Sequence, residues 1–323
     1  MKKVIKVIGI VVLCIIALLI LLIAALLIKN NIDQQKVLIP DDYYTWFKSD
    51  SVLEKKYSGL GSFDVSEKVI KSDDKVIGNF RIWYPSELES QQDKYPVIVM
   101  TNASNTAALN LAPALKRLAS WGFIVIGNDD RQTGTGASTS KTLDKILELG
   151  SDPKSIFHGK VSRDNIGIIG YSQGGAGALR AVTEYENGST YKTIFTGSAA
   201  YPFLAKNMGW EYDASKINIP WFMTAGTGSS DDSGVADINT EFGGVAPLAS
   251  LVESYNKIPE NVFKVRARVT GAEHEEMLIK TDGYMTAWML YYLKNDEDAS
   301  AAFIGKTAEI LNNSNWQDIE KNL

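Results

Sequence analysis

Cysteine and histidine are scarce in this sequence of 323 residues, and their scarcity excludes several kinds of site. The single cysteine, Cys14, rules out an intrachain disulfide and a cysteine metal site. Only two histidines are present, so a zinc site built from three histidines is impossible. Basic residues are not in excess either: the net charge is −5, which disfavours nucleic acid as a partner. The sequence thus implies no metal and no cofactor.

Charge is missing altogether from one stretch near the N-terminus. Residues 7–28 are 22 consecutive uncharged, mostly apolar residues, and as a helix they would span about 33 Å, enough to cross a hydrocarbon core about 30 Å thick. We therefore interpret residues 1–29 as a cytoplasmic stub and a transmembrane anchor. Lys2, Lys3 and Lys6 precede the run, which places the N-terminus in the cytoplasm and the remainder outside. The alternative is a cleaved signal peptide, but the run is long for one and no A-x-A site follows it.

After the anchor, the sequence is interpreted as a tether at 30–56 and one globular domain at 57–323. Within this domain short apolar runs alternate with helical patterns. Strands are expected at 62–70, 79–85, 96–100, 123–127, 166–170, 193–197, 220–226 and 263–269, the first two of them antiparallel. Helices are expected at 107–120, 142–149, 175–185, 247–256 and 277–293. The alternation predicts an α/β fold with a mostly parallel central sheet, whose sites form at the carboxyl ends of its strands.

One short motif carries a chemical prediction. The apolar run at 166–170 leads directly into G-Y-S-Q-G at 170–174 and then into a helical pattern. At a strand-to-helix turn, G-x-S-x-G lifts the serine hydroxyl out at the top of the sheet, and glycines flank the serine because the sharp turn leaves no room for side chains. The pattern occurs once in the chain. It predicts Ser172 as a nucleophile.

A serine nucleophile needs a base and an acid, and such sites often follow the chain order Ser, acid, His. His274 follows the last expected strand and precedes a helix, so it is the predicted base. His158 lies in a polar loop before the nucleophile and is predicted to be an exposed surface residue. The acid that orients the imidazole should follow the strand at 220–226. Asp231 and Asp232 both lie there; Asp231 is preferred, and Asp232 remains the alternative.

An acyl transfer also needs backbone N–H groups aimed at the developing oxyanion. These groups usually come from the residue after the nucleophile and from the loop after the third strand. The first of them is Gln173. The loop at 101–106 reads TNASNT, and the second donor is expected near Ser104.

With these residues in place, the chain from about residue 57 to about 306 resembles a particular group of α/β hydrolases. This group holds the bacterial cutinases and polyester (PET) hydrolases, together with chlorophyllase-like and platelet-activating-factor-acetylhydrolase-like esterases. The segments that carry the likeness are PVIVMTNASNT at 96–106, GKVSRDNIGIIGYSQGGAGAL at 159–179 and TGAEHEEML at 270–278. The resemblance implies the α/β-hydrolase fold, with helices on both faces of the sheet.

The resemblance also implies roles for single residues. It makes Ser172 the nucleophile, His274 the base, the N–H groups of Ser104 and Gln173 the oxyanion hole, and Phe203 the counterpart of a substrate-contacting tryptophan. The sequence departs from the family at two of its positions. Without gaps the family's acid would fall near Ser229, so the use of Asp231 requires a local insertion. Ser104 replaces an aromatic residue that is frequent there, which argues against aromatic polyesters as substrates.

Together these features predict a membrane-anchored, extracytoplasmic serine ester hydrolase that acts on a small-molecule or lipid-like ester through Ser172, His274 and Asp231. Two alternatives stay open. An acyltransferase would use the same residues but pass the acyl group to a hydroxyl other than water. A non-catalytic surface binding protein could also be built on a hydrolase scaffold.

Overall fold

The chain is divided into two units. The structure is a computed structural model, and it describes residues 15–26, 28–29, 32, 34 and 36–322. The units are Met1–Leu38 and Ile39–Leu323. In the first unit residues 15–26 are helical, whereas residues 7–14 and 27 of the run 7–28 that is expected to span the membrane lie outside the described residues. Within the described ranges, no helix has the combination of length and hydropathy that crossing a membrane requires.

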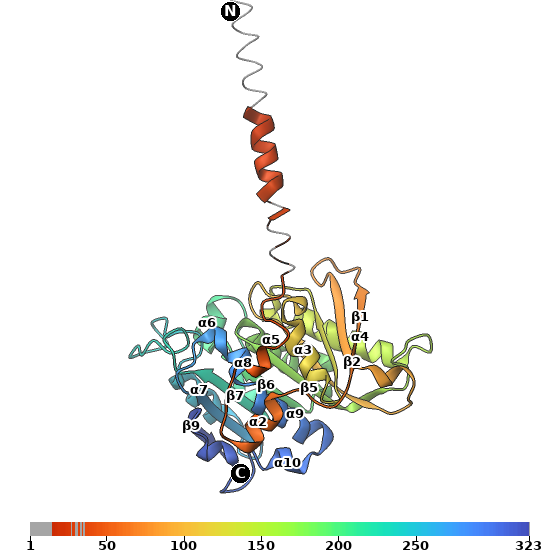
Figure 1. Ribbon diagram of the computed structural model, residues 1–323. Helices are drawn as coiled ribbons and strands as arrows, with labels where there is room; N and C mark the ends of the chain where they lie inside the picture. The colour runs from red at the N-terminus through yellow and green to blue at the C-terminus, as the bar shows by residue number, and fades with distance from the viewer. Residues whose placement is uncertain (1–14, 27, 30–31, 33, 35, 323) are drawn as a thin grey trace, which may run out of the picture. The chain divides into compact units, whose positions relative to one another are not determined.

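The second unit is built around one mixed sheet (Figure 1). Its strands are β1 (Val65–Lys71), β2 (Asn79–Pro85), β3 (Tyr95–Thr101), β4 (Ile124–Asn128), β5 (Val161–Tyr171), β6 (Thr193–Gly197), β7 (Trp221–Gly226), β8 (Lys264–Val269) and β9 (Trp316–Lys321). Their order across the sheet is β1-β2-β4-β3-β5-β6-β7-β8-β9. Strands β3 to β8 are mutually parallel. At the two edges β2 pairs antiparallel with β4, β1 antiparallel with β2, and β9 antiparallel with β8. The expected mostly parallel sheet is confirmed.

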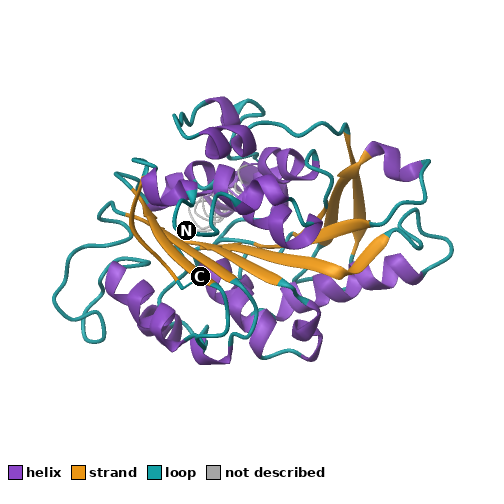
Figure 2. Cartoon of the chain, turned by 90° about the horizontal axis from the view of Figure 1, so that it is seen from below, coloured by secondary structure: helices purple, strands orange, loops and turns teal. Residues whose placement is uncertain are grey.

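Helices cover both faces of this sheet, as Figure 2 shows. They are α2 (Val52–Ser58), α3 (Ala112–Ala119), α4 (Ala137–Ser151), α5 (Gln173–Thr183), α6 (Pro202–Asn207), α7 (Leu248–Lys257), α8 (Met277–Lys280), α9 (Asp282–Lys294) and α10 (Glu297–Ser300). All five expected helical regions contain helix, with shifted ends. The sequence patterns did not indicate α2, α6, α10 or strand β9.

The uninterrupted apolar character of the central strands follows from this double cover. On β3, Ile98 packs into the core on one face of the sheet, whereas its neighbours Val97 and Val99 pack into the core on the other. Successive side chains of a strand point to opposite faces, so a strand covered on both sides has no polar face to show. The sheet is thereby held between two hydrophobic cores. The polar loops lie at the carboxyl ends of its parallel strands.

Residues 39–56, which form the second part of the tether predicted at 30–56, belong to the compact unit Ile39–Leu323. The ring of Tyr43 is completely buried. In α2 the buried Glu54 carboxylate accepts hydrogen bonds from Asn313 Nδ2 (2.8 Å) and Trp316 Nε1 (2.5 Å). Trp46 in the same segment remains 55% exposed. The segment from 39 to 56 therefore packs mainly through Tyr43 and α2.

Candidate active site

Ser172 lies at the sharp turn between β5 and α5. Its backbone has φ 55° and ψ −125°, a strained conformation for a residue with a side chain. A Cβ on Gly170 would lie 2.2 Å from the carbonyl oxygen of Gly174, so only glycine allows this turn to close. The serine itself is half-buried. This is the geometry that G-x-S-x-G is expected to take at a strand-to-helix turn, with the hydroxyl held at the top of the sheet.

His274 and Asp231 meet across two loops at the same edge of the sheet. His274 begins a 3-10 turn (His274–Glu276) shortly after β8, and Asp231 follows β7. Their side chains are 2.6 Å apart, measured from His274 Nδ1 to Asp231 Oδ1. Asp231 is completely buried, and its other oxygen, Oδ2, accepts from Ser198 Oγ (2.5 Å) and from the N–H of Gly226 (2.6 Å). The arrangement suits an acid that orients an imidazole.

Asp232, the alternative acid, has partners other than the histidine. Its Oδ2 accepts a hydrogen bond from Arg268 Nη1 (2.7 Å) and one from the N–H of Leu248 at the start of α7 (3.2 Å). Asp232 therefore ties the loop to β8 and α7, and Asp231 is the carboxylate that contacts His274.

A second contact joins the loop of the acid to the loop of the base. Ser230 donates from its N–H (3.1 Å) and its Oγ (2.7 Å) to Oε2 of Glu273. These hydrogen bonds lower the pKa of the Glu273 carboxyl. The N–H of Gly228 donates to the carbonyl of Ala272, 2.8 Å away, and a Cβ on Gly228 would lie 2.3 Å from Glu273 Cδ. The residues immediately before Asp231 and before His274 are thus fastened to each other.

The two expected oxyanion donors belong to neighbouring segments. Gln173 is the first residue of α5, and the loop with Ser104 follows β3. A Cβ on Gly174 would lie 2.2 Å from the carbonyl oxygen of Thr101 and 2.4 Å from that of Asn102. Helix α5 therefore begins directly against the loop, and Ser104 is exposed two residues further on.

Gln132 supports this arrangement, and no sequence pattern indicated it. The side-chain Nε2 of Gln173 donates to Gln132 Oε1 (2.9 Å), and Gln132 Nε2 donates to Oδ1 of Asn105 (3.3 Å), which follows Ser104. Asn105 has a left-handed backbone with φ 57°. The chain of amides connects the start of α5 to the loop of the second donor, although Gln132 lies on a third loop, after β4.

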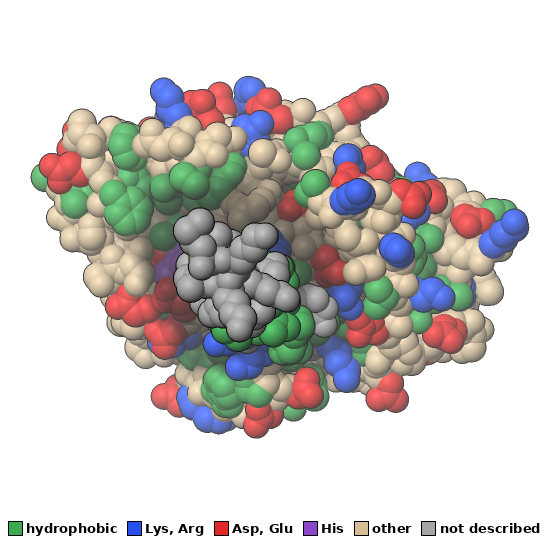
Figure 3. Space-filling view, turned by 90° about the horizontal axis from the view of Figure 1, so that it is seen from above, with side chains coloured by type: hydrophobic (Ala, Val, Ile, Leu, Met, Phe, Trp, Pro, Cys, Tyr) green, Lys and Arg blue, Asp and Glu red, His purple; other side chains and the backbone are tan. Residues whose placement is uncertain are grey.

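Phe203 lies on α6, half-buried, next to the carboxyl end of β6. Its ring stacks on that of Tyr201, with centroids 6.0 Å apart. The Tyr201 hydroxyl donates to the carbonyl of Glu241 (3.1 Å) and accepts from the N–H of Gly243 (3.3 Å). The long loop after the acid is thereby fixed beside Phe203, and its Phe242 is 58% exposed. On the face drawn in Figure 3, hydrophobic side chains gather at the upper left, and charges of both signs are interspersed over the visible remainder.

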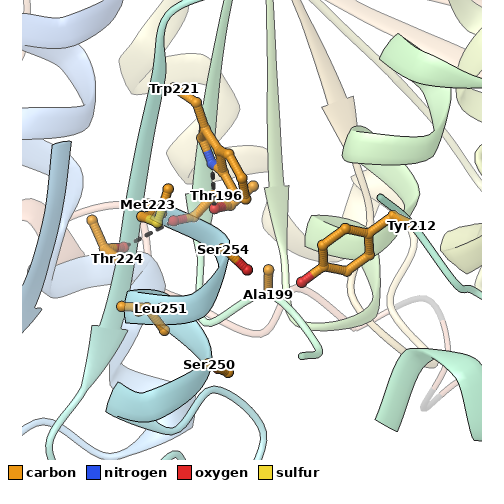
Figure 4. A pocket seen from close by; sticks show the side chains of 9 residues that line it. All are labelled: Thr196, Ala199, Tyr212, Trp221, Met223, Thr224, Ser250, Leu251 and Ser254. Atoms are coloured by element: carbon orange, nitrogen blue, oxygen red, sulfur yellow. Dashed lines mark hydrogen bonds between the residues drawn. The ribbon is translucent and has the colours of Figure 1, made fainter. Parts of the chain in front are cut away.

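Two further features are the second histidine and a small cavity. His158 is exposed in the turn after α4, as predicted. Between β6, β7 and α7 lies a cavity of about 20 Å³, room for about one water molecule. Figure 4 shows the hydroxyls of Tyr212 and Ser254 beside it, with Ala199 between them. Among the described residues, no group of three or more His, Cys, Asp or Glu side chains could hold a metal ion.

Comparison with known proteins gives a consistent family. A sequence profile for proteins described as PET hydrolase-like matches residues 49–320. Cutinase 2 of Thermobifida cellulosilytica is 24% identical over 255 residues, which are 77% of this chain and 85% of that protein. Cutinase est1 of Thermobifida alba is 25% identical over 260 residues, 77% of this chain and 75% of that protein. The matched range contains all of the candidate site residues, and the resemblance noted in the sequence is confirmed.

Proposed function

Since the chain belongs to the PET hydrolase-like family, whose members are serine hydrolases of carboxylic esters, we propose that Ser172, His274 and Asp231 form its catalytic triad. The observation that carries this proposal is the 2.6 Å contact between His274 and the fully buried Asp231, at the edge of the sheet where the half-buried Ser172 lies in its strained turn. The buried carboxylate of Asp231, the imidazole of His274 and the strained Ser172 come from three different loops. Their convergence favours catalysis over a scaffold that only binds.

The proposed reaction has two halves. His274 takes the proton of Ser172 Oγ, which attacks the ester carbonyl carbon, and the same imidazole then protonates the departing alcohol. A water molecule, deprotonated by His274, attacks the acyl-serine, and the acid product leaves with Ser172 restored. Asp231 keeps the imidazole in the tautomer that has Nε2 free for Ser172 and stabilises the imidazolium that forms. The N–H groups of Gln173 and Ser104 stabilise the oxyanion in both halves.

The expected substrate is a small-molecule or lipid-like ester. Phe203 and the exposed Phe242 supply apolar surface beside the site. Ser104 stands in place of an aromatic side chain, so no ring is available at that position to stack on an aromatic acyl group of the substrate. A series of p-nitrophenyl esters of increasing acyl length tests this on the purified protein. Activity restricted to the shortest acyl chains would favour an esterase over a lipase. Transfer of the acyl group to added alcohol in preference to water would favour the acyltransferase.

Residues 7–28 are proposed to anchor the protein in the membrane with the catalytic unit outside the cytoplasm. The proposal is supported by the 22 uncharged residues and the lysines before them. If it is correct, the full-length chain stays in the membrane fraction through an alkaline wash, and external protease digests its catalytic unit. A shorter, released form would instead indicate a cleaved signal peptide.

A fluorophosphonate probe tests the triad directly, because it labels only an activated serine. We expect labelling of the wild-type protein and none of Ser172→Ala. His274→Gln should also abolish labelling, and the matched variant of the other histidine, His158→Gln, should be labelled like the wild type. Equal labelling of wild type and Ser172→Ala, or no labelling of the wild type, would refute the proposed function.

A further inference from the structure

Ser198, the first residue after β6, has a conformation that serine rarely adopts. Its φ is 46°, in the left-handed region that favours glycine, and it is 1% exposed. Its N–H donates to the carbonyl of Thr224 on β7, 2.8 Å away. Strained, buried residues of this kind cluster at functional sites. The steps of hydrolysis described above do not use its side chain.

The turn after β6 contacts both the nucleophile and the acid. The N–H of Ser172 donates to the Gly197 carbonyl (3.0 Å), and the Ser172 carbonyl accepts from the N–H of Ala200 (3.1 Å). Between these two contacts, Ser198 Oγ donates to Asp231 Oδ2 at 2.5 Å. One four-residue turn therefore holds the backbone of the serine and the carboxylate of the acid.

The two carboxylate oxygens of Asp231 have different hydrogen-bond partners. Oδ2 accepts from Ser198 Oγ and from the N–H of Gly226, whereas Oδ1 contacts His274 Nδ1. Hydrogen bonds to an ionised carboxylate are short and strong. Two of them on one oxygen fix the plane of the group, and the other oxygen is then directed at the imidazole.

We propose that Ser198 is a positioning residue: its hydroxyl fixes the plane of the Asp231 carboxylate and, through it, the orientation of the His274 imidazole. The inference rests on the proposed function, because it assigns Ser198 to the same triad. The left-handed backbone at 198 aims Oγ at Asp231. The hydroxyl thus holds an acid that lies in the loop after β7, two residues beyond the position near Ser229 where the family resemblance places the acid.

Steady-state kinetics on Ser198→Ala provide the first test. With p-nitrophenyl acetate we expect kcat to fall about tenfold, the effect of one lost hydrogen bond to a charged group, and KM to stay within about twofold. The matched control is Ser250→Ala, which removes another buried hydroxyl, one that donates to the Pro247 carbonyl in the first turn of α7 (2.7 Å). A wild-type kcat in Ser198→Ala, or an equal fall in Ser250→Ala, would overturn the inference.

Ser198→Gly separates the hydroxyl from the strained backbone. Glycine takes φ 46° without strain, so this variant should unfold at a higher temperature than Ser198→Ala. It lacks the hydroxyl all the same, and we expect the same loss in kcat as for alanine. Recovery of wild-type kcat in Ser198→Gly would show that the backbone conformation, and not the hydroxyl, is what matters, and would overturn the inference.

A proton NMR spectrum measures the orientation of the imidazole without turnover. The chain has only two histidines, and the exposed His158 is an internal reference for His274. In Ser198→Ala we expect the Nδ1 proton resonance of His274 to move upfield or broaden, while the His158 signals stay in place. An unchanged His274 resonance would overturn the inference even in an active enzyme. Absence of fluorophosphonate labelling of the wild type would refute the triad itself. The two outcomes are therefore distinguishable: labelling of the wild type tests the triad, and the His274 resonance in Ser198→Ala tests the positioning role of Ser198.

Discussion

Two of the buried aspartates in the unit Ile39–Leu323, Asp231 and Asp282, have surroundings that differ in kind. Asp231 and Asp282 are 0% and 1% exposed. Asp231 contacts an imidazole, a hydroxyl and a backbone N–H. Asp282, at the start of α9, forms an ion pair with the equally buried Arg117 of α3 (Nε to Oδ2, 3.0 Å) and accepts from the Tyr43 hydroxyl. One carboxylate is therefore surrounded by neutral donors and the other by a full positive charge.

This difference fits the catalytic role proposed for Asp231 and a structural role for Asp282. A guanidinium beside Asp231 would cancel the charge that stabilises the imidazolium during catalysis, whereas neutral donors keep that charge available. At Asp282 burial raises the pKa of the carboxyl, which reflects the cost of a buried charge. Arg117 offsets this cost and also donates to Thr286 Oγ1 (2.8 Å) and the Tyr57 carbonyl (2.8 Å). Changes at Asp231 should therefore affect turnover, and changes around Asp282 should affect folding.

The largest effect is expected from Asp231→Asn. An amide cannot stabilise the imidazolium and favours the wrong tautomer, so kcat should fall about 10⁴-fold, as it does when the orienting acid of a serine protease is changed to Asn. The unfolding midpoint in urea should move little, because the shape is kept. Asp232→Asn is the matched control next to it, and it should retain most of the wild-type kcat. Equal losses of kcat in Asp231→Asn and Asp232→Asn would contradict the assignment of Asp231 as the acid.

Arg117→Met should show the opposite pattern. It leaves Asp282 buried without its charge partner, which costs about 3–5 kcal/mol in free energy of unfolding. The kcat per folded molecule should stay near the wild-type value. Urea unfolding measures the first quantity, and titration of labelled Ser172 counts folded sites for the second. Lys116→Met, at the exposed neighbouring position, is the control; a variant of Arg117 as stable as this control would contradict the ion pair's role.

How much of this the sequence predicts depends on whether a pattern is local. Ser172 and His274 follow from short motifs at the ends of apolar runs. The choice between Asp231 and Asp232 needed the structure, because adjacent residues share every sequence signal but have different hydrogen-bond partners.

Contacts between distant parts of the chain left no pattern at all. Arg117 and Asp282 are 165 positions apart, and nothing near either residue indicates the pairing. In the sequence Ser198 is only a small polar residue after a strand, which is common. Its left-handed φ angle, which sets it apart, is known only from the structure. Strand β9 was missed because its residues, WQDIEK, are mostly polar, as suits an edge strand whose pairing to β8 is antiparallel.

Tyr43→Phe tests the part of the network that surrounds the ion pair of Arg117 and Asp282, with a smaller expected effect. The hydroxyl donates to Asp282 and accepts from Arg117 Nε (2.9 Å), so its removal should cost about 1–2 kcal/mol in free energy of unfolding. Tyr44→Phe, at the half-buried neighbour, should cost less. Combined with Arg117→Met, Tyr43→Phe should add less than its single effect, because the two side chains share one network. Full additivity in urea unfolding would mean that Tyr43 stabilises the fold independently of the ion pair.

The smallest effect is expected at Glu273, whose part-buried contact with Ser230 lies beside the proposed triad. Its pKa is lowered from the ordinary value of 4.5 by the hydrogen bonds from Ser230. A carboxyl with a lowered pKa in the folded state stabilises the fold above its ordinary value, and this contribution is lost as the pH falls through the lowered pKa. The difference in unfolding midpoint between wild type and Glu273→Gln should therefore be present at pH 7 and should shrink as the pH falls below 4.5 and through the lowered pKa. Glu275→Gln, one residue after the base and exposed, should show no such difference. A gap between wild type and Glu273→Gln that persists or widens in acid would mean that packing on Gly228, and not the charge, holds the two loops together.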